Sequence, residues 1–188
     1  MLVLACTPGL MRAQFSQDRP KAEYMFKADL GYMVFNSNVG EDKTSEFTIP
    51  DQRHIPMVSV MNGVCLNQDF FVGVGLGYGY AVPSHAMKEN LSNGWHTLAA
   101  FVDADYRPLD RAWSPMAYAK LGATFMPEVE NVRNATLSAL GEIGLGLNWY
   151  YDYRYVNMER NYRSLYFEVG FAYTQMASFF TARLGVRF

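Results

Sequence analysis

A serine–histidine pair is the first arrangement in this chain that could support catalysis. His85 follows Ser84 directly, and Glu89 and Ser92 lie nearby. Such a pair can form a nucleophile when a third group orients the imidazole ring. Because Ser-His neighbours in a polar stretch are common by chance, we interpret them as solvated loop residues and predict no catalytic site. The other two histidines of the chain are His54 and His96.

Charged residues form the second candidate group, because many of them recur at alternate positions of short apolar segments. Their carboxylates could serve acid–base catalysis or a proton path. The acids are Glu23, Asp29, Asp103, Asp105, Glu142 and Glu168, and the bases are Lys27, Arg107, Lys120, Arg183 and Arg187. Since the two signs occur in similar number, we predict instead a charge network that fills a narrow interior.

Metal, cofactor and nucleic-acid sites are not indicated. The histidines lack the spacing of metal ligands, and the acidic run at 40–46 lacks the pattern of a calcium loop. Glycines from Gly73 to Gly79 repeat with period two and no helical pattern follows, unlike a dinucleotide-binding loop. The net charge of -2 provides no basic surface for nucleic acid. We therefore expect no metal, no cofactor and no nucleic-acid partner.

The composition combines apolar content with low overall hydropathy. Half of the 188 residues are hydrophobic, 15% are aromatic and 18% are charged, yet the mean hydropathy is -0.09. This is too apolar for a disordered chain. The chain has no run of about 18 or more apolar residues, which argues against a membrane-spanning helix. Strict alternation of apolar and polar residues explains how a high apolar content can coexist with a mean hydropathy near zero, because the two kinds of residue cancel in the average.

Residues 22–35 show this alternation clearly. One parity is apolar or aromatic from Ala22 to Val34, and the other mixes charge, glycine and methionine. A β-strand sends the two sets to opposite faces. The pattern recurs in segments 58–66, 70–80, 98–107, 117–125, 139–149, 165–173 and 180–188. Each segment is near the roughly 9–11 residues that a tilted strand needs to cross a bilayer, so we predict eight strands.

The connections between these segments alternate in length. Long polar connections are expected at about 36–55, 82–94 and 126–136, with shorter turns at 67–69 and 108–114. Long loops outside and short turns on the periplasmic side are typical of outer-membrane barrels. Two connections depart from this rhythm, because 150–164 is long where a turn is expected and 175–178 is short where a loop is expected.

Alternation alone does not show which face of the strands lies inside the barrel. In a soluble barrel the apolar face, with Val72, Val74 and Leu76, would point inward. Mixed charge and glycine on the polar face instead suit a narrow lumen. Aromatic residues near the strand ends of the apolar face also resemble membrane-interface girdles. One set is Tyr24, Phe70, Tyr106, Trp149, Phe167 and Phe188, and the other is Tyr32, Tyr78, Tyr80, Phe125, Tyr173 and Phe180. We predict an all-β fold, an eight-stranded antiparallel up-and-down transmembrane β-barrel with a polar, charge-paired lumen.

The last segment adds a specific resemblance. Its apolar residues Phe180, Leu184, Val186 and Phe188 resemble the C-terminal sorting signal that the barrel-assembly machinery reads. From about Lys21 the chain resembles the OmpA/OmpX-like family of small outer-membrane barrels, particularly the barrel domain common in Bacteroidetes. The resemblance implies a bacterial outer-membrane location, with membrane lipid and the barrel-assembly machinery as partners.

The domain organisation is expected to be simple. Residues 1–14 resemble the tail of a secretory signal peptide whose true start lies upstream, with lipid modification of Cys6 as an alternative. Residues 21–188 form a single barrel domain. If Cys6 is removed, Cys65 has no partner, so no disulfide framework is expected.

The predicted function is that of an integral outer-membrane β-barrel with a structural or surface-interaction role and no enzymatic activity. An extracellular partner would bind at the connections 36–55 and 82–94. Three alternatives stay open. They are a lipid A-modifying barrel enzyme of the PagL or PagP kind, a narrow channel, and a soluble calycin-like ligand-binding barrel.

Overall fold

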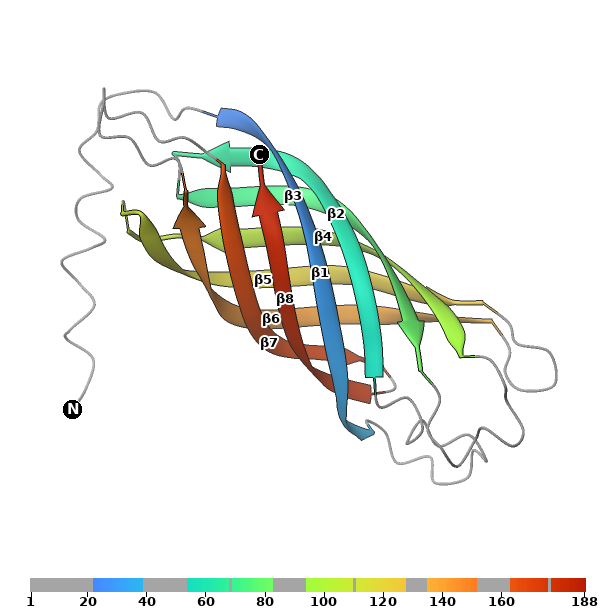
Figure 1. Ribbon diagram of the computed structural model, residues 1–188. Helices are drawn as coiled ribbons and strands as arrows, with labels where there is room; N and C mark the ends of the chain where they lie inside the picture. The colour runs from blue at the N-terminus through green and yellow to red at the C-terminus, as the bar shows by residue number, and fades with distance from the viewer. Residues whose placement is uncertain are drawn as a thin grey trace, which may run out of the picture.

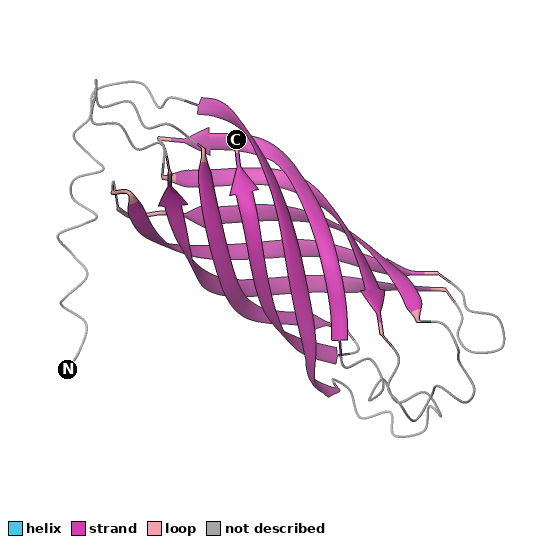
Figure 2. Cartoon of the chain, viewed as in Figure 1, coloured by secondary structure: helices cyan, strands magenta, loops and turns pink. Residues whose placement is uncertain are grey.

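Eight antiparallel strands close into a barrel (Figures 1 and 2). The computed structural model describes residues 22–38, 54–67, 69–82, 94–109, 111–127, 135–151, 163–175 and 177–188. The strands are β1 (Ala22–Asn38), β2 (His54–Leu66), β3 (Phe70–Ala81), β4 (Trp95–Tyr106), β5 (Trp113–Met126), β6 (Thr136–Tyr150), β7 (Ser164–Thr174) and β8 (Ala177–Arg187). Each strand pairs with its sequence neighbours, and β8 pairs with β1. The predicted eight-stranded up-and-down barrel is therefore confirmed.

Some strands are longer than the alternation predicted. β2 begins at His54 instead of residue 58, and β5 begins at Trp113 instead of residue 117. The additional residues of β5 continue the pairing with β6, with Trp113 opposite Trp149. Pro115 lies in this extension, opposite Leu147 of β6. Because the pairing of β4 with β5 reaches only to Ala117, Pro115 has a partner strand on one side alone, where proline is tolerated.

The barrel has two rims that differ in their connections. The rim that holds Phe188, here called the C-terminal rim, carries the turn between β2 and β3, where Asn67 has a φ of 51°. Asparagine tolerates this left-handed conformation better than most residues. Asp69 N donates to Leu66 O across the turn at 3.2 Å. The opposite rim holds the ends of β1, β3 and β5.

Closure of the barrel depends on β8 meeting β1 along most of its length. The register runs from Lys27 opposite Arg187 to Asn38 opposite Ala177, with one irregularity between Phe35 and Ser37. Backbone bonds in both directions between Phe26 and Phe188, at 3.0 and 2.9 Å, extend the ladder to the last residue of the chain. No unpaired strand edge is left along this seam.

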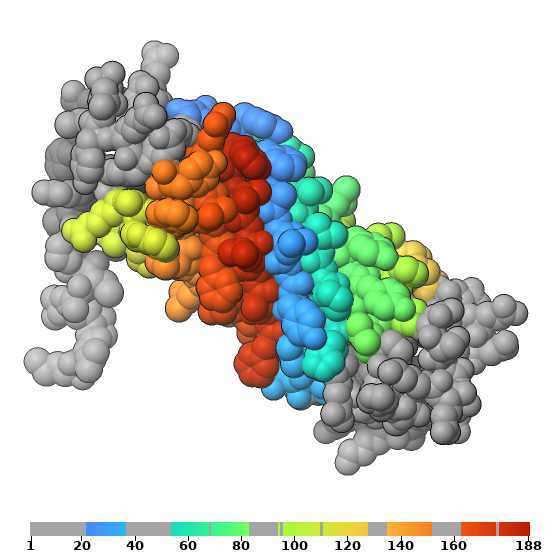
Figure 3. All heavy atoms as spheres, in the orientation of Figure 1, coloured from blue at the N-terminus to red at the C-terminus, as the bar shows by residue number. Residues whose placement is uncertain are grey.

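The outer face is apolar, which decides between the two barrel classes. Val74 and Leu76 are each 65% exposed, so the soluble barrel with these residues pointing inward is wrong. Both predicted aromatic sets also point outward. Figure 3 shows side chains of neighbouring strands covering the visible face continuously. Among the described residues, no helix has the length and apolar character needed to cross a membrane.

Aromatic side chains fill the lumen where glycines make room for them. A Cβ atom on Gly185 would lie 2.3 Å from the Tyr166 ring, and one on Gly75 would lie 2.5 Å from the Phe101 ring. Both contacts are far shorter than packed atoms allow, so these two positions require glycine. The interior of an eight-stranded barrel is only wide enough for its own side chains.

The lumen has two chemically different halves. Towards the C-terminal rim it contains the charged side chains, together with Met25, Met61, Phe71 and Phe101. Towards the opposite rim it is lined by an apolar cluster that includes Met33, Ile55, Leu140, Ala172 and Phe179. The predicted polar, charge-paired lumen is therefore confirmed, and inward methionine and leucine add an apolar cluster towards the opposite rim.

The barrel has inverted polarity, with an apolar outer face and charged residues inside. This arrangement predicts that a charge placed on the outer face lowers stability. Ile143 lies in the middle of β6 and is 65% exposed. We expect Ile143→Arg to lower the free energy of unfolding in phospholipid vesicles by about 2–4 kcal/mol, the usual cost of arginine facing lipid near the midplane. Urea titration followed by tryptophan fluorescence measures this change. Ile143→Leu serves as the control, and equal stability of the two variants would contradict a lipid-facing position.

Candidate functional site

The candidate site is the cluster of charged side chains inside the barrel. Alternation along the strands sends these residues inward, and all are at most 3% exposed. They are Lys27 and Asp29 on β1, Asp103 and Asp105 on β4, Lys120 on β5, Glu142 on β6, Glu168 on β7, Arg183 and Arg187 on β8, and Arg107 just after β4. We call this set the lumenal charge cluster.

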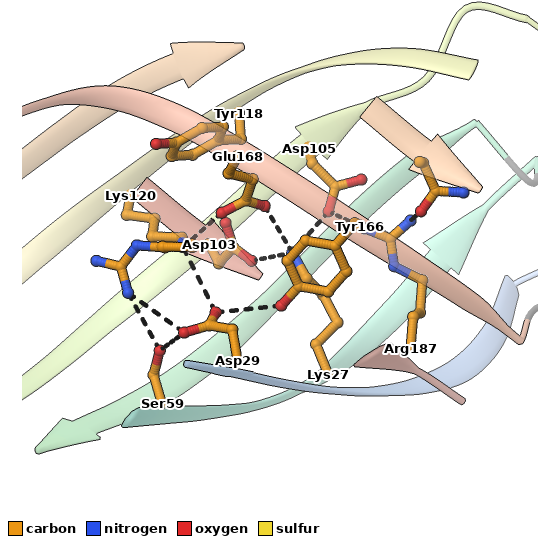
Figure 4. Close-up of polar contacts among 12 residues, drawn as sticks. Lys27, Asp29, Ser59, Asp103, Asp105, Tyr118, Lys120, Tyr166, Glu168 and Arg187 are labelled. Carbon is orange, nitrogen blue, oxygen red and sulfur yellow. Dashed lines mark hydrogen bonds and ion pairs between the residues drawn. The ribbon is translucent and has the colours of Figure 1, made fainter. Parts of the chain in front are cut away.

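Lys27 is surrounded by carboxylates (Figure 4). Its Nζ atom lies 2.6 Å from Asp103 Oδ2 and 2.8 Å from Asp105 Oδ2, and both are hydrogen bonds. Glu168 Oε1 is 3.8 Å away. The Phe71 ring centroid lies 4.8 Å from the same ammonium. Lys27 therefore neutralises carboxylates from two other strands in a site without solvent exposure.

Two arginines complete the environment of Asp105. Arg187 Nη2 donates to Asp105 Oδ2 at 2.8 Å, and Arg107 Nε lies 3.2 Å from Asp105 Oδ1. Arg107 also donates to the Tyr150 hydroxyl at 2.7 Å. Arg187 donates to Asn148 Oδ1 at 3.1 Å. These neutral partners accept from guanidinium groups that would otherwise have unpaired donors.

Arg183 forms a bidentate pair with Glu142. Its Nε and Nη2 atoms donate to the two oxygens of Glu142 at 3.0 and 2.7 Å, a bidentate arrangement that fixes both side chains. Its Nη1 atom lies 3.3 Å from Asp29 Oδ1. Asp29 in turn accepts hydrogen bonds from Ser59 and from the Tyr166 hydroxyl, as Figure 4 shows.

Lys120 joins the two parts of the cluster. Its Nζ atom donates to Glu168 Oε2 at 3.0 Å and lies 3.9 Å from Asp29 Oδ2. Every member is thereby connected through ion pairs to every other. The cluster contains five carboxylates and five cations, so its formal charges cancel. Burial of ions is tolerable only when each one has such a partner.

Glu23 does not join the cluster. It is half-buried near the C-terminal rim and forms no ion pair with the described residues. Sequence reasoning also missed the neutral members Ser59, Tyr118, Tyr166 and Asn148. Their signal was available, because each shares the inward parity of a charged neighbour on the same strand or pairs opposite one.

The described histidines lie outside the lumen. His96 and His54 are both exposed. The Nδ1 atom of His96 lies 2.6 Å from the Tyr78 hydroxyl oxygen, and the His54 ring packs 5.7 Å from that of Tyr32. Ser84, His85, Glu89 and Ser92 fall outside the described residues. Within the described part of the chain, no group of three or more His, Cys, Asp or Glu side chains could hold a metal ion.

Charge balance in the cluster predicts a large effect of removing one ion. We expect Lys27→Met to lower the free energy of unfolding by about 3–5 kcal/mol, because it leaves buried carboxylates without their cation. Glu23→Gln, the matched control outside the cluster, should change it by at most about 0.5 kcal/mol. Equal effects of the two substitutions in urea titrations would contradict the balance.

A double substitution separates charge from packing. Within the described residues, Lys27 is the cation that pairs with Asp103. We expect Lys27→Met/Asp103→Asn to be more stable than Lys27→Met, because the second change restores equal numbers of buried charges. A double variant as unstable as the sum of both single changes would show that packing, not charge, sets the cost.

Comparison with known proteins supports the fold. No family model matches the chain, and no curated protein matches it in sequence. Its structure is similar to neisserial surface protein A, with a TM-score of 0.60, 13% identity, and coverage of 89% of this chain and 97% of that one. The N-terminal barrel domain of Pseudomonas aeruginosa OprF has a TM-score of 0.49, 13% identity, and coverage of 89% and 100%. Yersinia pestis Ail has a TM-score of 0.47, 16% identity, and coverage of 88% and 100%.

The likeness to neisserial surface protein A extends over nearly the whole of both chains, so it concerns the complete barrel. Lipid demands that every backbone polar group be bonded internally, and a closed barrel meets this demand. The apolar outer face adds the required surface. Together these observations confirm the predicted class and location, an eight-stranded β-barrel of the bacterial outer membrane.

Proposed function

We propose that this chain is a structural or surface-interaction protein of the outer membrane and that it has no enzymatic activity. The observation that carries the proposal is the lumenal charge cluster, which fills the lumen next to the C-terminal rim with paired ions. Side chains bonded in this way are neither free to bind a substrate nor poised to transfer a proton. The function then resides in the rims and in the outer face.

The proposed orientation places the C-terminal rim in the periplasm. Short turns are usual on that side and long connections on the other. The connections at 36–55 and 82–94 then face the environment, and we propose them as the places where an extracellular partner binds. Most of both stretches falls outside the described residues, so this part of the proposal rests on the topology of the strands that flank them.

The finer family assignment is also a proposal. We infer an OmpA/OmpX-like protein of the Bacteroidetes type, with the last strand read by the barrel-assembly machinery. In support, Phe180, Leu184 and Phe188 lie exposed on the outer face, where another protein can contact them, whereas Val186 is half-buried. Residues 1–14, proposed as the remnant of a signal peptide, fall outside the described residues.

A narrow channel is the second candidate. The lumenal charge cluster argues against it, because ten interlinked ions leave few mobile groups along the axis. Planar-bilayer recordings of the refolded protein should show no steady single-channel conductance. A steady conductance that changes in Lys27→Met would favour the channel over the structural role.

Membrane fractionation tests the main proposal. We expect the processed chain to remain in the outer-membrane fraction after washing with carbonate and high salt, because its apolar outer face is solvated by lipid, and to leave it only with detergent. Western blotting of the fractions measures the distribution. Recovery as a detergent-free soluble monomer would refute the membrane location.

Deletion of Phe188 tests the proposed sorting signal. We expect the deletion to reduce the assembled barrel in cells several-fold while purified protein still refolds in detergent, because recognition and not stability is lost. Phe125→Ala, an aromatic truncation at the opposite rim, is the control and should assemble normally. Equal losses in cells and in refolding would assign Phe188 a stabilising role alone, through its bonds to Phe26.

A further inference from the structure

The lumen near the rim opposite Phe188 contains a cavity that the charge cluster does not fill. It has a volume of about 40 Å³. Its walls are mainly apolar and include Met33, Met57, Met126, Ile55, Leu140 and Phe179. Arg183 lies at its inner end, where the lumenal charge cluster begins. The cavity is therefore closed towards the C-terminal rim by paired ions.

Glycine packing shows where the cavity wall can accept an added side-chain atom. At Gly75, deeper in the barrel, an added Cβ atom would lie 2.5 Å from the Phe101 ring. At Gly77, on the cavity wall, the nearest atoms would be Ala99 Cβ at 3.5 Å and Phe101 Cε1 at 3.6 Å, which are ordinary contacts. Gly77 thus has space for an added Cβ atom, whereas the space beside Gly75 is occupied by a ring. An unfilled apolar space lowers stability, so a bound apolar group would stabilise the barrel.

Three of the polar side chains on the cavity wall, Thr124, Thr174 and Arg183, are already bonded elsewhere, and Thr97 is the fourth. The Thr174 hydroxyl donates to Ala177 O at 3.1 Å, and the Thr124 hydroxyl donates to Ser138 O at 3.5 Å. Arg183 donates to Glu142 and Asp29. These three groups are not available to orient a polar ligand and the rest of the wall is mainly apolar, so the part of a ligand that enters is apolar.

The position of the cavity and the narrow interior of the barrel indicate a chain instead of a ring system. Two residues of its wall are sequence neighbours of outward-facing aromatic residues near this rim: Met33 follows Tyr32, and Phe179 precedes Phe180. Such aromatic residues mark the membrane–water interface, so the cavity lies at the depth where lipid headgroups meet their chains. The interior of an eight-stranded barrel is narrow, and methionine side chains adapt to flexible apolar groups.

We propose that this cavity binds the end of a single unbranched aliphatic chain, which enters from the rim opposite Phe188 and stops at Arg183. The chain belongs to a fatty acid or, in the orientation proposed above, to a lipid of the outer leaflet. The site binds and does not catalyse. It is separate from the proposed surface role, because it involves the lumen and not the loops.

Photolabelling of the full chain in phospholipid nanodiscs tests the proposal. The probes are a sixteen-carbon fatty acid with a terminal diazirine and a lysophospholipid that carries the same chain. We expect crosslinks, assigned to single residues by mass spectrometry, on Met33, Met57 or Met126. Labelling by both probes indicates that the chain alone is recognised, and labelling by one identifies its source.

Filling the cavity supplies the decisive comparison. Gly77→Leu should reduce labelling of these methionines at least tenfold. Gly141→Leu is the matched control, because an added Cβ atom there meets only Leu121 Cδ2 at 3.7 Å and the side chain faces outward; its lumenal labelling should equal that of the unaltered protein. Ala99→Leu fills the same space if Gly77→Leu does not fold.

Two results would overturn the proposal. One is labelling confined to outward residues such as Val34 and Leu121, and the other is lumenal labelling unchanged in both filled variants. Either result would leave the membrane location and the surface role intact, because labelling of the outer face by the same probes still reports a barrel in lipid.

Discussion

Cancellation of charge inside the barrel is the constraint on which the rest of the structure depends. Ten ions lie in a space with almost no solvent, and each is held by an opposite charge. Arg107 pairs with Asp105 of its own segment, and the other nine ions have a partner on another strand. No strand carries a complete set, since Lys27 on β1 needs Asp103 on β4, and Arg183 on β8 needs Glu142 on β6. The closed barrel is therefore the arrangement that brings these partners together, and opening it would expose unpaired charge to lipid.

The same alternation that hides the ions creates the outer surface. A residue between two inward ions must face outward, and in this chain those residues are apolar, such as Ala28 between Lys27 and Asp29. Glycine opposite large rings lets Tyr166 and Phe101 lie across the lumen without widening the barrel. Where the ions end, at Arg183, methionine takes over the inward positions and the packing loosens into a cavity.

Sequence patterns predicted the strands, their parity, the membrane class and the balance of charge, because period-two alternation and residue type are local properties. They did not predict the partners. Lys27 meets Asp103 across the lumen, three strands away, and that contact depends on the register and tilt of every intervening pair. Glu23 has the right parity but lies at the rim, beyond the reach of the cluster. Nor did they predict that the inward Met33 and Leu140 meet in one apolar cluster, because that contact requires the closed barrel.

Accessibility of spin labels along β6 tests the inverted polarity most directly. Single cysteines at positions 143, 145 and 147, in a chain that lacks Cys6 and Cys65, would carry nitroxides in phospholipid vesicles. Inward positions 138 and 140 provide the comparison. The account predicts high collision rates with dissolved oxygen and low rates with a water-soluble nickel complex at the three outward positions, and low oxygen rates at the inward ones. High nickel accessibility at 143, 145 and 147 would show that this face meets water and would contradict a barrel solvated by lipid.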